Sequence, residues 1–288
     1  MAFCRKDCTM GLFTPNYNKP GPGVYKDGPQ KHRIWQFFEI FWNQLSKLSL
    51  ANIIYFIAMI PLVAGLLLCF KLDFSSPSIV VLKHANQIDL LGFILIIISI
   101  FVSFPANLGF TFILRNIQRR EHAWIWHDFI RHTKENYVKG VLNGIIVLVT
   151  YYLLFTAFGV YRSGIFDIGI VNMFLSSIIV VIGIIFTWMQ FYVNTMIVTF
   201  DLKLKDIYKN SLIFALGKLP LNILISVVNI IVLMLILMIP IPVITYILWF
   251  LILYALFGII TVFMVYPTID KYMIKSAEDT KDIADDTK

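Results

Sequence analysis

The sequence predicts an all-α membrane protein with about six transmembrane helices and amphipathic cytoplasmic helices between some of them. Composition is the first reason: 59% of the 288 residues are hydrophobic and 14% are charged, against about 25% charged in soluble domains. The second is charge distribution, because neither Ile168–Phe200 nor Leu219–Ile269 contains an Asp, Glu, Lys or Arg. Since about 20 mostly apolar helical residues cross the hydrocarbon core of a bilayer, both runs are long enough to span it.

The chain divides into three parts. Residues 1–32 are rich in proline and glycine, which disfavour regular structure, and we interpret them as a cytoplasmic tail. Residues 33–274 form a single polytopic membrane domain. Residues 275–288 carry a high density of Lys, Asp and Glu, and we expect this C-terminal tail to be disordered.

The first predicted helix of the membrane domain lies on the membrane surface. Its apolar residues recur at intervals of three and four, opposite a polar side that contains Gln36, Glu39, Asn43 and Lys47. The apolar residues are Ile34, Phe37, Phe38, Phe41, Leu45 and Leu48. This helix leads into a first span over about 48–70, and a second span follows over about 90–114.

Two further amphipathic segments separate the remaining spans. A basic segment follows the second span, and its apolar and aromatic residues predict a second interfacial helix: Trp124, Trp126, Phe129, Ile130 and Tyr137. Spans follow over about 140–160 and 169–200. A third amphipathic segment, 201–218, has one apolar side formed by Leu204, Ile207, Tyr208, Leu212, Ala215 and Leu216. Pro240 and Pro242 divide the last uncharged run into spans over about 219–239 and 243–266.

The basic residues predict the orientation. Cytoplasmic loops accumulate Lys and Arg, and a cytoplasmic N-terminus would leave only Lys71, Lys83 and Arg162, of 24 basic residues, on the outside. We therefore expect both termini in the cytoplasm.

The two longer cytoplasmic loops resemble each other. Asp128-Phe129-Ile130-Arg131 precedes Asn143 by nearly the same distance as Asp206-Ile207-Tyr208-Lys209 precedes Asn222. One interpretation is a duplicated helical-hairpin unit, as many transporters contain. The alternative is that any multispan protein alternates basic loops with apolar helices.

The sequence offers no carrier for catalysis. His122, His127 and His132 are five residues apart, which turns successive side chains by about 140° on a helix and does not gather them for a metal. Cys4 and Cys8 could begin a metal site, but no second ligand pair follows. A nucleophile elbow, a zinc-binding His pair and a phosphate-binding glycine loop are also missing. We therefore expect no enzymatic activity, no metal and no cofactor.

The net charge of +7 does not indicate a nucleic-acid partner, because the basic residues border the apolar runs, as they do in membrane proteins. Since no predicted span carries a charge at its centre, a pump or channel built on intramembrane carboxylates is disfavoured. Amides remain, and five could line a neutral polar path: Asn107, Asn143, Gln190, Asn194 and Asn222. The alternative is that these amides only hydrogen-bond neighbouring helices.

Four segments of the chain together resemble the YesL-like family of bacterial integral membrane proteins. They are Asn16-Tyr17-Asn18-Lys19-Pro20-Gly21-Pro22-Gly23-Val24, Pro105-Ala106 ahead of Arg115, Trp126-His127-Asp128-Phe129, and Tyr266-Pro267-Thr268-Ile269-Asp270-Lys271. The resemblance covers about Met10–Ile274, so residues 1–9 are expected to be an extension or a misplaced start. Where the family tends toward Gly-Pro-Ala-Thr-Ala-Ala, this chain has Phe104-Pro105-Ala106-Asn107-Leu108-Gly109, which puts close helix packing there in doubt.

The resemblance implies a protein of the bacterial cytoplasmic membrane whose gene neighbours include carbohydrate importers and two-component regulators. We expect an accessory or regulatory component of oligosaccharide uptake, whose partners would be carbohydrate ABC importer subunits or a sensor kinase. Its partner-contact candidates are Arg115, Arg119, Asp128, Phe129 and Asp206. Two alternatives stay open: a substrate-translocating, permease-like subunit that uses the five amides, and cytoplasmic helices that only anchor the chain to anionic lipid.

Overall fold

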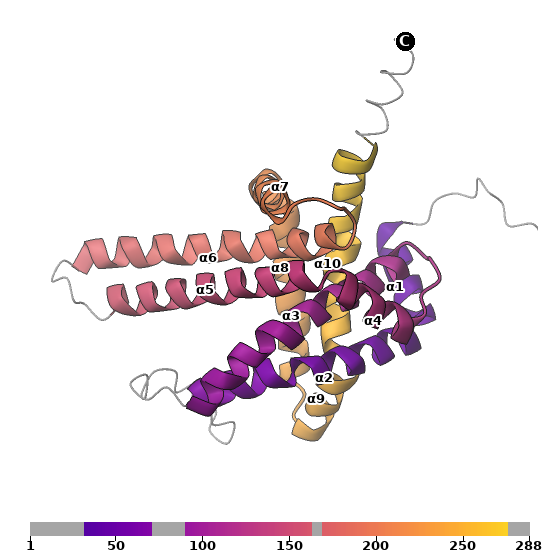
Figure 1. The fold of residues 1–288 in the computed structure, drawn as a ribbon, viewed down its shortest axis with the longest axis horizontal. Coiled ribbons are helices and arrows are strands. Elements are labelled where there is room, and N and C mark those ends of the chain that lie inside the picture. Colours follow the sequence, from indigo (N-terminus) through magenta and orange to yellow (C-terminus); the bar gives the residue numbers. More distant parts are fainter. Residues whose placement is uncertain (1–31, 71–89, 163–168, 276–288) are drawn as a thin grey trace, which may run out of the picture.

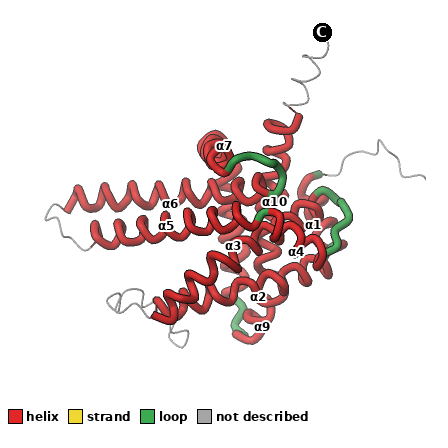
Figure 2. Tube along the Cα trace, in the orientation of Figure 1, coloured by secondary structure: helices red, strands yellow, loops and turns green. Residues whose placement is uncertain are grey.

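The computed structural model describes residues 32–70, 90–162 and 169–275, and every regular element in these ranges is a helix (Figure 2). The first part of the chain forms α1 (Arg33–Asn43), α2 (Leu45–Phe70), α3 (Leu90–Gln118), α4 (Ile125–Glu135) and α5 (Tyr137–Arg162). The second part forms α6 (Gly169–Ile197), α7 (Leu204–Gly217), α8 (Leu219–Leu237), α9 (Pro242–Leu248) and α10 (Tyr254–Ile269). Both predicted tails lie almost wholly outside the described residues.

Six helical stretches are long and apolar enough to cross a membrane, so the predicted all-α membrane fold is confirmed. They are Leu45–Cys69, Leu90–Gln118, Tyr137–Tyr161, Gly169–Ile197, Leu219–Leu237 and Val243–Ile274. Several helix ends differ from the predicted span ends, and the largest difference is in the last stretch, which continues past 266 to Ile274. The second span continues past 114 to Gln118, and the fourth ends at Ile197 because the chain turns there toward α7.

The long helices form two hairpins and a crossing pair. In Figure 1, α2 with α3 and α5 with α6 extend toward the same side, whereas α8 and α10 run across them. The hydrophobic core lies where these pairs meet. Away from it, α5 and α6 expose large apolar side chains such as Tyr152, Leu153, Met173 and Phe174, as expected of surfaces that contact lipid.

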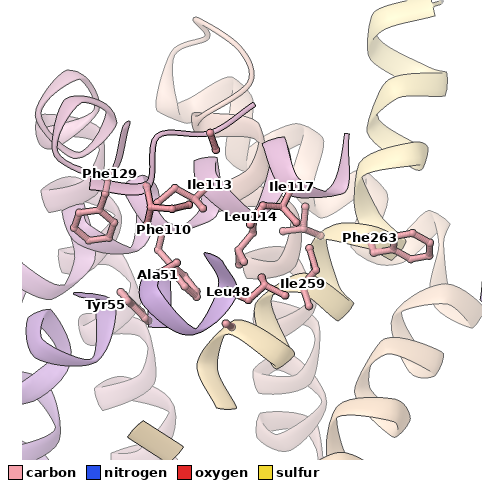
Figure 3. Packing of buried hydrophobic residues seen from close by; sticks show 14 of the residues in the cluster. Leu48, Ala51, Tyr55, Phe110, Ile113, Leu114, Ile117, Phe129, Ile259 and Phe263 are labelled. Atoms are coloured by element: carbon pink, nitrogen blue, oxygen red, sulfur yellow. The ribbon is translucent and has the colours of Figure 1, made fainter. Parts of the chain in front are cut away.

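Helix α3 is at the centre of this core. Figure 3 shows its buried residues Phe110, Ile113, Leu114 and Ile117 among side chains from α2, α4 and α10. Glycines allow close contact on several sides of the helix. A Cβ on Gly140 of α5 would lie 2.7 Å from the Cα of Pro105, and one on Gly144 would lie 2.7 Å from Cγ of Phe104. The bulky Phe104, where the resembled family tends toward Gly, is thus accommodated by a glycine on the facing helix.

The predicted surface helix is α1, which packs one side against the bundle. Phe37 contacts Phe263 of α10 edge to face, with ring centroids 5.4 Å apart, and Ile40 is buried. Ile34 and Phe38, which share the predicted apolar stripe, point outward together with Trp35 and Trp42. The helix therefore has apolar side chains on both its protein face and its open face.

The predicted break at Pro240 and Pro242 is confirmed, since α8 ends at Leu237 and α9 begins at Pro242. A turn of π-helix, η1 (Trp249–Leu253), then joins α9 to α10, and a second π-helical turn, η2 (Asp270–Lys275), follows α10. A π-helical turn changes the backbone hydrogen-bond pattern. Buried Asn52 of α2 supplies partners there: its Nδ2 donates to the carbonyls of Trp249 and Phe250, and its Oδ1 accepts from the amide of Ala255, at 3.2, 2.8 and 2.7 Å.

The order of long, short and long helices occurs twice, as α3–α4–α5 and as α6–α7–α8. In both, an Asp lies in the first turn of the short helix, and the next residue, Phe129 or Ile207, is buried. The order agrees with a duplicated unit, and the duplication itself stays a prediction.

The end of α3 depends on an arginine in a left-handed conformation. Arg120 has a φ of 58°. The amide of Glu121 donates to the carbonyl of Asn116, and the amide of Arg120 donates to the carbonyl of Ile117. This is a Schellman motif, in which glycine is usual. The conformation costs an L residue about 1 kcal/mol, while the exposed ion pair of Arg120 with Glu39, at 3.6 Å, contributes less.

Arg120→Gly is therefore expected to leave the unfolding temperature unchanged or to raise it slightly, whereas Arg120→Val should lower it, because a β-branched residue is strained there. Thermal unfolding of the detergent-purified variants checks both. Equal destabilisation by Gly and Val would mean that the ion pair with Glu39, not the backbone conformation, decides stability at this position.

Candidate functional site

Arg115, a predicted partner contact, is instead buried and holds two helices together. Because α3 continues to Gln118, the side chain lies inside the bundle. Its Nη1 donates to the carbonyl of Val198 at 2.6 Å and to Oγ1 of Thr199 at 3.3 Å, at the C-terminal end of α6, where a cation is favourable. Its guanidinium lies 4.5 Å from the ring centroid of Phe112. The prediction of a partner contact was wrong for this residue.

Asp128 and Phe129 also stabilise the fold. Oδ2 of Asp128 accepts a hydrogen bond from the amide of Trp124 at 2.8 Å, and the amide of Asp128 donates to the carbonyl of Trp124, so the two residues close the first turn of α4. Phe129 is buried in the core against α2 and α3, so its prediction as a partner contact was wrong (Figure 3).

Arg119 and Asp206 are the two partner-contact candidates that remain exposed. Arg119 pairs with Glu121 at 2.8 Å, and both side chains are about 40% exposed, so the pair contributes little to stability. Asp206 lies on the open side of α7.

Helix α7 presents a mixed basic and apolar face to its surroundings. Its buried side consists of Ile207, Ser211, Phe214 and Ala215. Leu212 and Leu216, which belong to the predicted apolar side, are exposed instead, together with Ile213. We define the α7 face by its exposed residues Lys205, Asp206, Lys209, Leu212, Ile213 and Leu216. It lies outside the six apolar stretches that could cross a membrane.

Three of the five predicted path amides meet at the junction of α5, α6 and α7. Nδ2 of Asn143 donates to Oδ1 of Asn194 at 3.2 Å, while Oδ1 of Asn143 accepts from the hydroxyl of Tyr208 at 2.5 Å. Nε2 of Gln190 lies 3.5 Å from that hydroxyl. Burial raises the pKa of Tyr208, so its hydroxyl stays protonated and donates. We call these four residues the amide cluster.

Asn222 and Asn107 lie outside the amide cluster. Asn222 is fully buried, accepts from the hydroxyl of Tyr192 at 2.7 Å, and donates to the carbonyls of Phe214 and Ala215 at the end of α7. It thereby joins α6, α7 and α8. The side chain of Asn107 on α3 makes no hydrogen bond to another described residue. The five amides therefore do not form one continuous hydrogen-bonded row.

The exposed side of α4 was not among the predicted sites. Trp126, His127, Ile130, Arg131 and Lys134 line an open hollow there. Nε of Arg131 donates to Oε1 of Glu135 at 2.8 Å, and this hydrogen bond lowers the pKa of Glu135. Lys134 makes no ion pair with any residue that the structure describes. The sequence signal was the combination of tryptophan and basic residues in this segment, which predicted an interfacial helix but did not show which of its side chains are open.

His132, on the inner side of α4, predicts a pH dependence of stability. It stacks on Phe112 of α3 and pairs with Glu135 at 2.8 Å; burial lowers its pKa, although Glu135 acts in the opposite direction. At a pH just below the ordinary histidine pKa of about 6.5, His132 therefore binds a proton more readily in the unfolded chain than in the folded chain. Stability is expected to fall as the pH falls through that value.

Thermal unfolding at pH 7.5 and 5.5 measures this effect. His132→Gln should show a smaller difference between the two pH values than the wild type, while the exposed-site control His127→Gln should keep the wild-type difference. An unchanged difference in His132→Gln would assign the dependence to other groups.

No three His, Cys, Asp or Glu side chains in the described ranges converge as they would around a metal ion. Cys4 and Cys8 lie outside those ranges.

Comparison with known proteins gives one family match. Residues 86–158, which include α3, α4 and most of α5, match the family described as "Protein of unknown function, DUF624". YesL-like proteins, which the motifs of this chain resemble, belong to that family. No curated protein and no solved structure matches the chain.

Proposed function

We propose that this chain is a non-enzymatic, YesL-like membrane protein that serves as an accessory or regulatory component of carbohydrate uptake. The observation that carries the proposal is the α7 face, on which Leu212, Ile213 and Leu216 are exposed beside Lys205 and Lys209. An exposed apolar group bordered by charge is typical of a surface that binds a protein partner. The partner class, importer subunits or a sensor kinase, rests on the family resemblance.

The hydrogen bonding of the amides supports an accessory role over translocation. A solute path requires polar groups that are available to the solute. Asn222 instead uses its Oδ1 and its Nδ2 within the protein, and so does Asn143. Such pairing is what structural amides between membrane helices usually do.

The proposed setting is the bacterial cytoplasmic membrane, with both termini and the α7 face in the cytoplasm. The excess of basic residues beside α4 and α7 supports this orientation. A single cysteine at position 162, in a background without Cys4, Cys8 and Cys69, tests it. A membrane-impermeant thiol reagent should label that cysteine from outside intact cells, and labelling only after lysis would reverse the orientation.

Crosslinking in the native membrane tests the partner. The tagged full-length protein is purified after mild crosslinking, and its partners are identified by mass spectrometry. Lys205→Glu with Lys209→Glu reverses the charge of the α7 face, and Arg131→Glu with Lys134→Glu on α4 is the matched control.

We expect carbohydrate-importer subunits or a sensor kinase with the wild type and the α4 control. Their recovery should fall about tenfold or more with the α7 variant, because like charges across an interface cost several kcal/mol. Equal recovery from all three would exclude the α7 face as the contact. Absence of both partner classes from the wild-type sample would contradict the accessory role.

A second candidate function is a translocating subunit. Its polar path would pass the amide cluster, where Asn143, Gln190 and Asn194 lie beside Tyr208, although Asn143 is already hydrogen-bonded there. Purified protein in liposomes distinguishes the two. Uptake of labelled oligosaccharide by the chain alone, abolished by Asn194→Leu, would support translocation, whereas no uptake supports the accessory role.

A further inference from the structure

Four of the six tryptophans gather on two short segments and are exposed. Trp35 and Trp42 lie on α1, and Trp124 and Trp126 lie at the start of α4; each is between 65% and 69% exposed. Of the other two, Trp188 donates from its ring nitrogen to Oγ of Ser226 at 2.9 Å, and Trp249 lies in η1. Tryptophan is enriched where a membrane protein meets the headgroup layer, because its ring is apolar and its N–H is polar.

The connections of the chain keep both helices close to the bilayer surface. Gln44 alone separates α1 from α2, and Asn136 alone separates α4 from α5. Since α2 and α5 are long enough to span the membrane, the last turns of α1 and α4 lie within a few ångströms of where these spans begin. The ion pair of Arg120 with Glu39 links α1 to the segment that precedes α4.

The charge on the open side of α4 complements an anionic headgroup. The ammonium of Lys134 is exposed and makes no ion pair with a described residue. Arg131 uses Nε for Glu135, but its two Nη atoms make no hydrogen bond within the described part of the chain. Two of its N–H groups can therefore point at a phosphate in the bidentate manner that guanidinium favours. Both side chains line the same hollow as Trp126.

We propose that the open face of α4 binds the phosphate of an anionic phospholipid headgroup, with Arg131 and Lys134 as its ligands and Trp124 and Trp126 as anchors at headgroup level. Both α4 and α7 lie one residue from a membrane span, so the side chains decide: lipid fits the α4 face better than a protein partner because that face carries exposed tryptophans together with basic groups. The α7 face, by contrast, has basic and aliphatic residues and no tryptophan. The lipid site does not depend on the proposed role in carbohydrate uptake.

Native mass spectrometry of the detergent-purified full-length protein tests the site. Phosphatidylglycerol is titrated against the wild type, against Arg131→Gln with Lys134→Gln, and against the α7 control Lys205→Gln with Lys209→Gln, which removes the same charge. Each basic residue near an anionic lipid surface strengthens binding about fivefold, so the α4 variant is expected to bind roughly 25-fold more weakly. The control should stay close to the wild type, and phosphatidylcholine binding should not distinguish the three proteins.

Two outcomes would overturn the proposal. An equal loss of phosphatidylglycerol affinity in both double variants would mean that binding depends on the total charge of the protein and not on the α4 face. No loss in the α4 variant would exclude Arg131 and Lys134 as ligands. Soluble glycerol phosphate serves as a competitor: displacement of the lipid at equal concentration would assign the site to a free anion instead. Because the substituted side chains are exposed, we expect all variants to elute as folded protein, which size-exclusion chromatography verifies.

Discussion

Replacement of Asn52 by Leu is expected to lower the free energy of unfolding by about 3 kcal/mol, because a buried polar group that loses its partner costs about 1 to 3 kcal/mol. The substitution removes partners from the Ala255 amide and from the carbonyls of Trp249 and Phe250. Hydrogen bonds between membrane side chains usually contribute less, since freed side chains find other partners. Here the partners are backbone groups of η1 and of the first turn of α10, which cannot rotate to find other partners as a side chain can.

Asn229→Leu is the matched control for Asn52→Leu. Asn229 of α8 also lies between helices, but its Nδ2 is 3.4 Å from Oγ1 of Thr261, and its buried Oδ1 has no hydrogen-bond partner. We expect this variant to be neutral or slightly stabilised. Thermal unfolding in detergent compares the two, and similar unfolding temperatures would show that Asn52 does not hold the π-helical turn.

Gly109→Ala is expected to destabilise the protein by about 3 kcal/mol, at the upper end of the usual cost of overpacking. A Cβ on Gly109 would lie 2.5 Å from the backbone oxygen of Phe129 and would also overlap Oγ1 of Thr133. A side chain could rotate away, but the backbone of α4 can yield only if the whole helix moves off α3. Displacement would also expose Phe129, which is now buried.

Gly159→Ala is the control, because no atom outside its own turn of α5 lies within 4 Å of the added Cβ. Alanine has the higher helix propensity, so we expect an unchanged or slightly higher unfolding temperature. Tryptophan quenching by brominated lipid adds a positional readout, since displacement of α4 should change the quenching of Trp124 and Trp126. If Gly109→Ala matches the control in both measurements, α4 does not pack on α3 as closely as the structure indicates.

The spans were predictable because the requirement that produces them is local. A helix in lipid satisfies its own backbone, so the apolar run determines where each span lies, and the prolines determine where the last run is interrupted. The surface helices were predictable for a related reason, since apolar residues such as Phe37 and Phe41 recur at the spacing of a single helix. The predicted stripe was wrong at its two ends, because Ile34 points outward and Leu48 belongs to α2. None of these inferences requires knowledge of how one helix packs against another.

The candidate site was harder to predict, and Arg115 shows why. The sequence predicts that the span ends just before Arg115, whereas α3 continues for four more residues, to Gln118, and is followed by Arg120 in a conformation that is usual for glycine. That extra turn buries Arg115 against the end of α6. Phe129 is similar, because an aromatic residue on an amphipathic helix can face either the core or a partner, and only the position of α3 decides.

The sequence by itself determined the membrane class, the six spans, the amphipathic helices and the candidate amides, because each depends on composition or on a period within one segment. Only the tertiary structure decided which faces of α4 and α7 are open, and which amides meet: Asn143 with Asn194, Asn222 with Tyr192, and Asn52 with the backbone of η1. The physical reason is that the partners of these hydrogen bonds are separated by tens to hundreds of residues. Helix packing brings them together, and no local pattern along the chain records which helices will meet.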